Sequence, residues 1–166
     1  KTLSIQKDNK RDKVFILDKV ISEKNEYLNL KYFKNNSGSG SIVNYFGKES
    51  KKNTMLESPF EFNSIKVESL TISNLFSEIN KTDDVVLKMD IQGAEPRVLN
   101  QIGDIISEYN IRLCFFEIND FDENVMKQAL KKFNGKYLLK NLDNSLIDEN
   151  NIKKYMKEIL VLEKIF

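Results

Sequence analysis

Residues 85–99 carry the pattern that most restricts the fold of this chain: a short apolar run, a glycine turn and an amphipathic helix. The run at 85–89 (VVLKM) is typical of a buried strand, and it stops at Asp90. Gly93 follows in the turn, and Pro96 stands where a helix accepts proline in its first turn. Apolar residues then recur at helical spacing, at Val98, Leu99, Ile102, Ile105 and Ile106. A strand, a tight turn and a helix in this order predict an α/β fold.

Other segments extend this alternation of strands and helices. Residues 35–41 (NNSGSGS) predict a loop, because Gly and Asn favour backbone conformations that neither helices nor strands adopt. The stretch 45–63 predicts an irregular connection. The whole pattern predicts one domain over 1–166 with a mainly parallel sheet. The predicted strands are 14–17 (VFIL), 27–33, 65–70, 111–118, 137–140 and 159–166, and helices are predicted to begin at Ser73 and at Asp122 or Glu123.

The composition restricts the chemistry. The chain of 166 residues has no histidine, which excludes Ser-His-Asp and Cys-His nucleophile pairs and histidine-containing zinc sites. The 26 basic and 25 acidic side chains are dispersed, so no nucleic-acid partner is predicted. Cys114 is alone in an apolar run, which predicts a buried, inert thiol and a reducing, cytoplasmic location. No apolar run is long enough to predict a membrane span.

Acidic residues follow three predicted strands: Asp18, Asp90 and Glu117. Ligands of open parallel sheets bind beyond the carboxyl ends of the strands, so these three carboxylates are candidates for one shared cleft. Structural alternatives stand beside this interpretation. Asp90 is also placed to cap the following helix, and Glu95 to interact with the helix dipole. Asp18 fits an ordinary loop acid, while Glu117 in its apolar run requires a partner or an exposed strand end.

Two weaker features of the sequence also have a functional and a structural interpretation. The loop at 35–41 is rich enough in glycine to surround a phosphate, yet it lacks the Lys and the following helix of a P-loop. Four aromatic residues suit a substrate groove, although aromatic side chains beside a sheet more often belong to the core. They are Tyr45, Phe46, Phe60 and Phe62.

Four blocks of the sequence resemble the FkbM family of S-adenosylmethionine-dependent methyltransferases, a branch of the Rossmann-like class I methyltransferases. Residues 14–25 resemble its third strand and the turn after it, 35–42 its Gly/Ser loop, and 67–76 a strand and short helix. The most specific block is 87–99 (LKMDIQGAEPRVL), which is similar to the family's Lys-x-Asp-x-Glu-Gly-x-Glu run. Together the blocks span about residues 14–118.

The sequence departs from the family pattern in several places. Gln92 stands where relatives usually carry Glu, and Asn119 where some carry His. The sequence contains neither an Asp-x-Gly-x-Asn-x-Gly loop for the methionine end of the cofactor nor the acid that holds its ribose. The resemblance therefore implies a Rossmann-like class I methyltransferase sheet, mainly parallel with an antiparallel C-terminal strand, whose N-terminal βαβ unit is missing. Residues 1–166 are then a single partial domain.

The resemblance also implies an activity and a set of site residues. The full domain is expected to transfer the methyl group of S-adenosylmethionine to a hydroxyl of a small molecule, sugar or glycan. Asp90, Glu117 and Glu95 are the expected catalytic residues, with Glu95 alternatively supporting the turn. Asp18, Val20 and Asp90 are expected to bind the cofactor. No metal cluster is evident, although paired carboxylates are compatible with Mg²⁺.

Two other functions fit parts of the sequence. A non-catalytic binding module on a methyltransferase-like sheet agrees with the missing cofactor loop and with Gln92. A phospho-acceptor domain would use Asp90 at the strand end, but the cluster of acids that such a domain needs near its first strand is missing.

Overall fold

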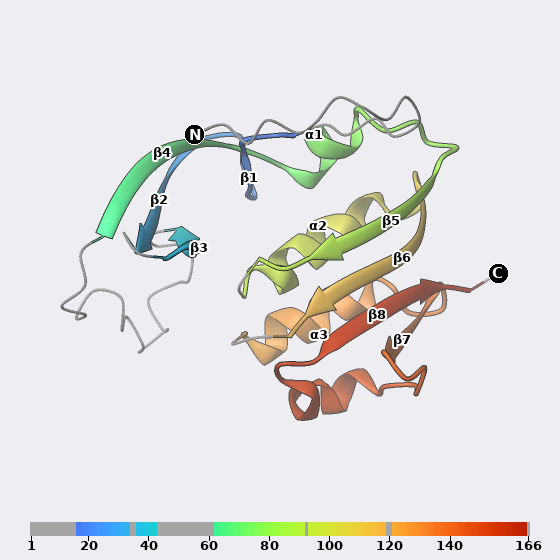
Figure 1. The fold of residues 1–166 in the computed structure, drawn as a ribbon. Helices are drawn as coiled ribbons and strands as arrows, with labels where there is room; N and C mark the ends of the chain where they lie inside the picture. Colours follow the sequence, from blue (N-terminus) through green and yellow to red (C-terminus); the bar gives the residue numbers. More distant parts are fainter. Residues whose placement is uncertain (1–15, 34–35, 43–61, 92, 119–120, 166) are drawn as a thin grey trace, which may run out of the picture.

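A computed structural model describes residues 16–33, 36–42, 62–91, 93–118 and 121–165, which form two four-stranded sheets with helices (Figure 1). The first sheet has the order β1-β4-β2-β3 and the second β5-β6-β8-β7. The strands are β1 Val20–Ile21, β2 Tyr27–Phe33, β3 Asn36–Ile42, β4 Phe62–Leu70, β5 Asp84–Met89, β6 Asn110–Glu117, β7 Tyr137–Asn141 and β8 Ile159–Lys164. The helices are α1 Ile72–Phe76, α2 Glu95–Ile105, α3 Glu123–Lys131 and a 3₁₀ helix, Glu149–Tyr155.

The direction of the strands differs from the predicted, mainly parallel sheet. Among the described strands, β1 with β4 and β5 with β6 pair in parallel, whereas the other pairings are antiparallel. The physical reason is the connections, because β5 reaches its parallel neighbour β6 through the helix α2, whereas β2 and β3 are separated by too few residues for a parallel crossover. The predicted α/β class is confirmed, and so is the antiparallel C-terminal strand, since β8 runs against both β6 and β7.

The prediction of a loop at 35–41 is wrong for its described part, because β3 occupies Asn36–Ile42. This strand pairs antiparallel with β2, with Lys31 opposite Ser41 and Phe33 opposite Asn36. Glycine and serine have little intrinsic preference for strands, but glycine tolerates extended backbone. Pairing of the backbone with β2 thus outweighs the local preference.

The prediction of a buried strand at 14–17 is wrong for its described part. Ile16 and Leu17 are 64% and 54% exposed and lie outside any strand. The strand β1 begins later, where Val20 pairs with Ser69 and Ile21 with Leu70. An apolar run forms a buried strand only when a neighbouring strand accepts it.

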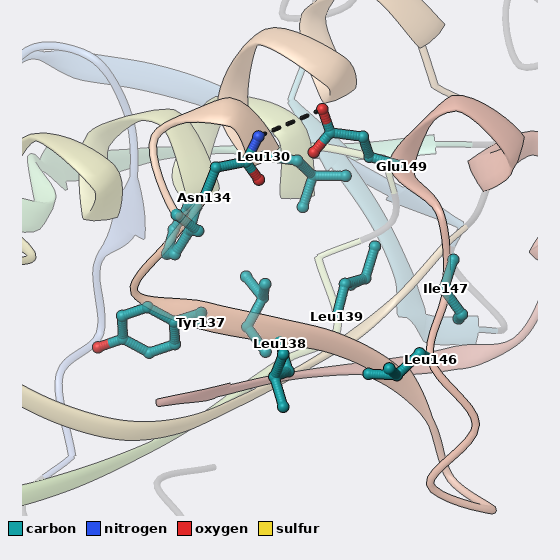
Figure 2. A pocket seen from close by; sticks show the side chains of 10 residues that line it. Leu130, Asn134, Tyr137, Leu138, Leu139, Leu146, Ile147 and Glu149 are labelled. Carbon is teal, nitrogen blue, oxygen red and sulfur yellow. Dashed lines mark hydrogen bonds between the residues drawn. The ribbon is translucent and has the colours of Figure 1, made fainter. Parts of the chain in front are cut away.

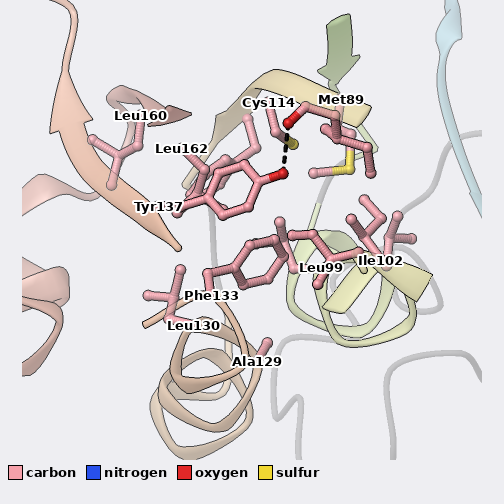
Figure 3. Packing of buried hydrophobic residues seen from close by; sticks show 14 of the residues in the cluster. Met89, Leu99, Ile102, Cys114, Ala129, Leu130, Phe133, Tyr137, Leu160 and Leu162 are labelled. Carbon is pink, nitrogen blue, oxygen red and sulfur yellow. Dashed lines mark hydrogen bonds between the residues drawn. The ribbon is translucent and has the colours of Figure 1, made fainter. Parts of the chain in front are cut away.

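The second sheet carries the main core of the described chain. Helices α2 and α3 lie on one face of this sheet (Figure 1), and the predicted apolar stripe of α2 points into it. Figure 3 shows how Leu99 and Ile102 of α2 meet Met89 and Cys114 of the sheet. Cys114 is buried, as predicted, and burial raises the pKa of its thiol to about 12. None of the described helices has the length and apolar character needed to cross a membrane.

The start of α3 was also predicted correctly. Asp122 is its N-cap residue, and its carboxylate accepts hydrogen bonds from the backbone N–H groups of Asn124 (2.8 Å) and Val125 (3.1 Å). The predicted cap of α1 is displaced by two positions. Thr71, not Ser73, caps that helix, with its side chain accepting from the N–H of Asn74.

Candidate active site at the strand ends

Two of the predicted acids lie at the carboxyl ends of neighbouring parallel strands. Met89 of β5 and Phe116 of β6 are register partners, and Asp90 and Glu117 are the residues that directly follow them. Asp90 is exposed, whereas Glu117 is half-buried and also faces Ile159 of β8. The structure therefore places Asp90 and Glu117 at the carboxyl ends of neighbouring strands, as predicted, whereas Asp18 precedes its strand and does not follow it.

The turn after Asp90 is held by the side chain of Glu95. One carboxylate oxygen of Glu95 accepts a hydrogen bond from the N–H of Ile91 at 2.9 Å, and the other accepts from the N–H of Gly93 at 2.7 Å. Gly93 has a φ of 97°, a left-handed conformation that glycine adopts without strain. The N-cap position of α2 is Ala94, which makes no side-chain cap, so Asp90 does not occupy the cap position considered for it.

The first turn of α2 also contacts the segment that follows β1. The guanidinium Nη1 of Arg97 lies 4.0 Å from Oε1 of Glu23. This contact connects the helix that follows the Asp90 turn with the segment that leaves the first sheet. Both side chains are partly exposed, and an ion pair of this kind contributes little stability.

The segment after β1 is fixed by a buried serine. Ser69 of β4 is 1% exposed, and its hydroxyl lies 2.8 Å from the carbonyl of Lys24 and 2.9 Å from that of Glu26. The same hydroxyl accepts from the N–H of Glu26 at 3.0 Å. The N–H of Ser22 donates to the carbonyl of Leu70 at 2.9 Å, which continues the contact between β1 and β4.

The residues predicted to bind the cofactor are divided between the two sheets. Asp18 is exposed and precedes β1, and Val20 lies half-buried within β1. Asp90 follows β5 in the second sheet. Asp90 and Glu117 thus follow neighbouring strands of the second sheet, whereas Val20 belongs to the first sheet and Asp18 precedes it.

Several predicted features lie outside the described residues. These are Gln92, Asn119 and the aromatic residues Tyr45, Phe46 and Phe60. Among the residues that the structure describes, no three His, Cys, Asp or Glu side chains are grouped so that they would hold a metal ion.

A separate hollow of about 240 Å³ lies between α3, β7 and the residues that precede the 3₁₀ helix (Figure 2). Its walls are mainly leucine, with Tyr137 and Ile147. At its rim, the side-chain amide of Asn134 donates to Oε1 of Glu149 at 3.4 Å. These elements carry none of the predicted site residues.

Two contacts in this region were missed by sequence reasoning. Arg97 lies in the block 87–99 that resembles the family, but no role was predicted for it. Its position two residues after Glu95 was the available sign that it lies beside the turn. Ser69 shares one side of β4 with Val67, as residues two apart in a strand do, and a polar residue among inward positions is a sign of a specific hydrogen bond.

Comparison with known protein families gives a match over most of the chain. The family model described as the methyltransferase FkbM domain matches residues 7–150. That range includes both strand-end acids, the Glu95 turn and the contacts of Ser69. No curated protein and no solved structure gives a significant match to the chain.

Proposed function

Because the chain belongs to the FkbM methyltransferase domain family, with most of its length matched, we propose that it transfers the methyl group of S-adenosylmethionine to a hydroxyl oxygen. The acceptor we propose is a sugar, a glycan or another natural product. The observation that carries this proposal is the placement of Asp90 and Glu117 at the ends of adjacent parallel strands. We also propose that the fold of this domain is Rossmann-like and that the protein is located in the cytoplasm.

The residues present fit the reacting end of S-adenosylmethionine. When bound, this cofactor supplies an electrophilic methyl group on a positively charged sulfonium. A carboxylate is the side chain expected beside such a charge, and Asp90 presents one at an exposed strand end. We assign Asp90 to this end and Asp18 with Val20 to the adenine end, following the family resemblance.

The acceptor hydroxyl needs a group that orients it and a group that takes its proton. Methylation of a hydroxyl oxygen releases that proton, and a carboxylate in hydrogen-bond reach accepts it. We propose that the Asp90 carboxylate accepts this proton. Glu117, half-buried on a strand paired on both sides, is suited to hold the hydroxyl in line.

Calorimetric titration of the full-length protein with S-adenosylmethionine tests the proposal. We expect saturable heat in the wild-type protein and about tenfold weaker binding in Asp90→Asn, because one charge-assisted contact is lost. Asp83→Asn is the matched control, since Asp83 is an exposed acid at the opposite end of β5. The absence of heat and of any thermal shift in the wild-type protein would overturn the proposal.

A second candidate function is that of a non-catalytic domain, which binds S-adenosylmethionine but does not transfer its methyl group. Gln92 supports this candidate, because an amide replaces the acid that relatives carry in the signature. A radiolabelled methyl donor separates the two functions. Binding without transfer to any of a panel of sugars and glycans, in wild-type protein and in Gln92→Glu alike, would favour the binding domain.

A further inference from the structure

Glu95 is a buried charged side chain beside the proposed site. It is 1% exposed, although it is the first residue of α2 and carries an ionisable carboxyl group. Burial of an ionised group is costly unless hydrogen bonds and nearby charges compensate it. Here both carboxylate oxygens accept backbone N–H groups, at 2.9 Å from Ile91 and 2.7 Å from Gly93. The N-terminal end of the α2 dipole adds further compensation.

These two hydrogen bonds act on the backbone that carries Asp90. The N–H of Ile91 belongs to the peptide bond that joins Asp90 to Ile91, so the contact at 2.9 Å fixes the orientation of that peptide plane. The N–H of Gly93 fixes the other end of the turn, where φ is 97°. With the strand end on one side and Glu95 on the other, the backbone of Asp90 is restrained in both directions.

We propose that Glu95 is a positioning residue, which sets the place of the Asp90 carboxylate through the turn and does not itself exchange protons with the acceptor. This inference rests on the proposed function, in which Asp90 faces the methyl donor and the acceptor hydroxyl. Its basis is that both oxygens of Glu95 are already engaged by the backbone and the side chain is shielded from solvent.

The alternative role for Glu95 is that of a helix-end stabiliser alone. Glu123 is a comparable acid at the first position of α3, where it forms ion pairs with Lys127 (2.8 Å) and Lys153 (3.2 Å). Glu123 makes these contacts with side chains and not with the Asp90 turn. Glu123→Gln is therefore the matched control for loss of a first-turn carboxylate.

Glu95→Gln changes the turn with little change in volume. The amide group of Gln has one oxygen acceptor, so its NH₂ group would face one of the two backbone N–H groups and leave that group without an acceptor. Glu95→Asp keeps the charge and both acceptor oxygens, and it serves as the second variant if Glu95→Gln does not fold. We expect the Glu95→Asp variant to keep part of the wild-type affinity for S-adenosylmethionine.

The first readout is a double-mutant cycle on the affinity for S-adenosylmethionine. We expect Glu95→Gln to weaken binding about tenfold and Asp90→Asn to cost much less in the Glu95→Gln background than in wild type. Glu123→Gln is expected to leave binding unchanged. Additive losses from Glu95→Gln and Asp90→Asn would overturn the positioning role, because they would show that Glu95 acts independently of Asp90.

The second readout does not depend on the cofactor. In NMR spectra, Glu95→Gln is expected to speed exchange of the Ile91 or Gly93 amide about tenfold and to shift the ¹³Cγ signal of Asp90, while Glu123→Gln does neither. An unchanged Asp90 signal would contradict the inference even if binding were weakened. If the wild-type protein fails to bind the cofactor, the proposed function fails, and the Asp90 signal still decides the role of Glu95.

Discussion

The hydroxyl of Tyr137 in β7 donates a hydrogen bond of 2.5 Å to the carbonyl of Ile111 in β6 (Figure 3). The pairing of β6 with β5 is irregular at this point, because Ile111 faces Val85 and Leu113 faces Val86, so Arg112 is an extra residue in the ladder. A bulge disrupts the regular hydrogen bonds of a sheet. The buried Tyr137 hydroxyl supplies a partner for a carbonyl at this bulge.

Replacing Tyr137 by Phe should therefore destabilise the fold. We expect a loss of about 1 to 2 kcal/mol in the free energy of unfolding, because the ring still packs while the Ile111 carbonyl loses its donor. Urea titration followed by circular dichroism measures the loss. Tyr27→Phe, at a side chain that is 64% exposed, is the control and should change little. Equal midpoints for both variants would show that the buried hydrogen bond contributes nothing.

The buried phenol of Tyr137 and the buried thiol of Cys114 predict a loss of stability at alkaline pH. Burial raises the pKa of Tyr137 from 10.0 to about 12, and burial raises that of Cys114 from 9.0 to about 12. Between the ordinary and the raised pKa, the folded protein keeps protons that the unfolded chain releases, so the free energy of unfolding falls as pH rises. Urea midpoints should decline from about pH 9 to about pH 12, and Tyr137→Phe should reduce the slope above about pH 10.

A further prediction concerns the reactivity of Cys114. A thiol that is 1% exposed and has a raised pKa should resist alkylation by iodoacetamide at neutral pH while the protein is folded. In denaturant the same thiol should react at the rate of a free cysteine. Mass spectrometry of the modified protein checks this, and rapid modification of the folded chain would contradict the burial of Cys114.

The packing of α2 against α3 predicts the effect of Gly103→Ala. A Cβ atom at Gly103 would lie 2.7 Å from both Cβ and Cδ of Lys132, the C-cap residue of α3, so the two segments would have to shift apart. We expect a loss of about 1 to 3 kcal/mol from this overpacking. Combining the change with Lys132→Ala tests the reason, because this removes the clash with Cδ and keeps that with Cβ, so Gly103→Ala should cost less in the Lys132→Ala background but should still cost stability. Thermal unfolding measures both variants.

The Ser69 hydroxyl predicts an effect on the segment after β1. Ser69→Ala removes the group that contacts the carbonyls of Lys24 and Glu26, and we expect a loss of about 1 to 3 kcal/mol. Hydrogen exchange over 22–26 should quicken more than exchange over β6. Ser73→Ala, at an exposed residue of α1, is the control. Unchanged exchange over 22–26 would show that β4 fixes this segment by other contacts.

The second half of the fold was predictable because periodicity and burial agree there. The stripe of α2 and the cap of α3 at Asp122 depend on local pattern, and both formed as expected. The strand ends at Asp90 and Glu117 were predictable for the same reason, since strands β5 and β6 were marked by apolar runs.

The first half was less predictable because its pairings join distant segments. Residues 36–42 became a strand by pairing with β2, although their composition favours a turn. Residues 16–17 stayed exposed, and the chain paired only from Val20. The contacts of Glu95 were only partly foreseen, because a side chain that reaches back across a turn leaves no periodic signal in the sequence.

The distances along the chain between paired strands also set an order for folding. In the second sheet Val85 pairs with Ile111, and Leu139 with Leu162, so these pairings close short loops. The pairings of Val20 with Ser69 in the first sheet and of Leu113 with Glu163 in the second join residues that are much farther apart in the chain. Contacts between near segments form faster, since closing a longer loop costs more entropy. We expect the pairing of β5 with β6, which Asp90 and Glu117 follow, to form before the pairing of β1 with β4.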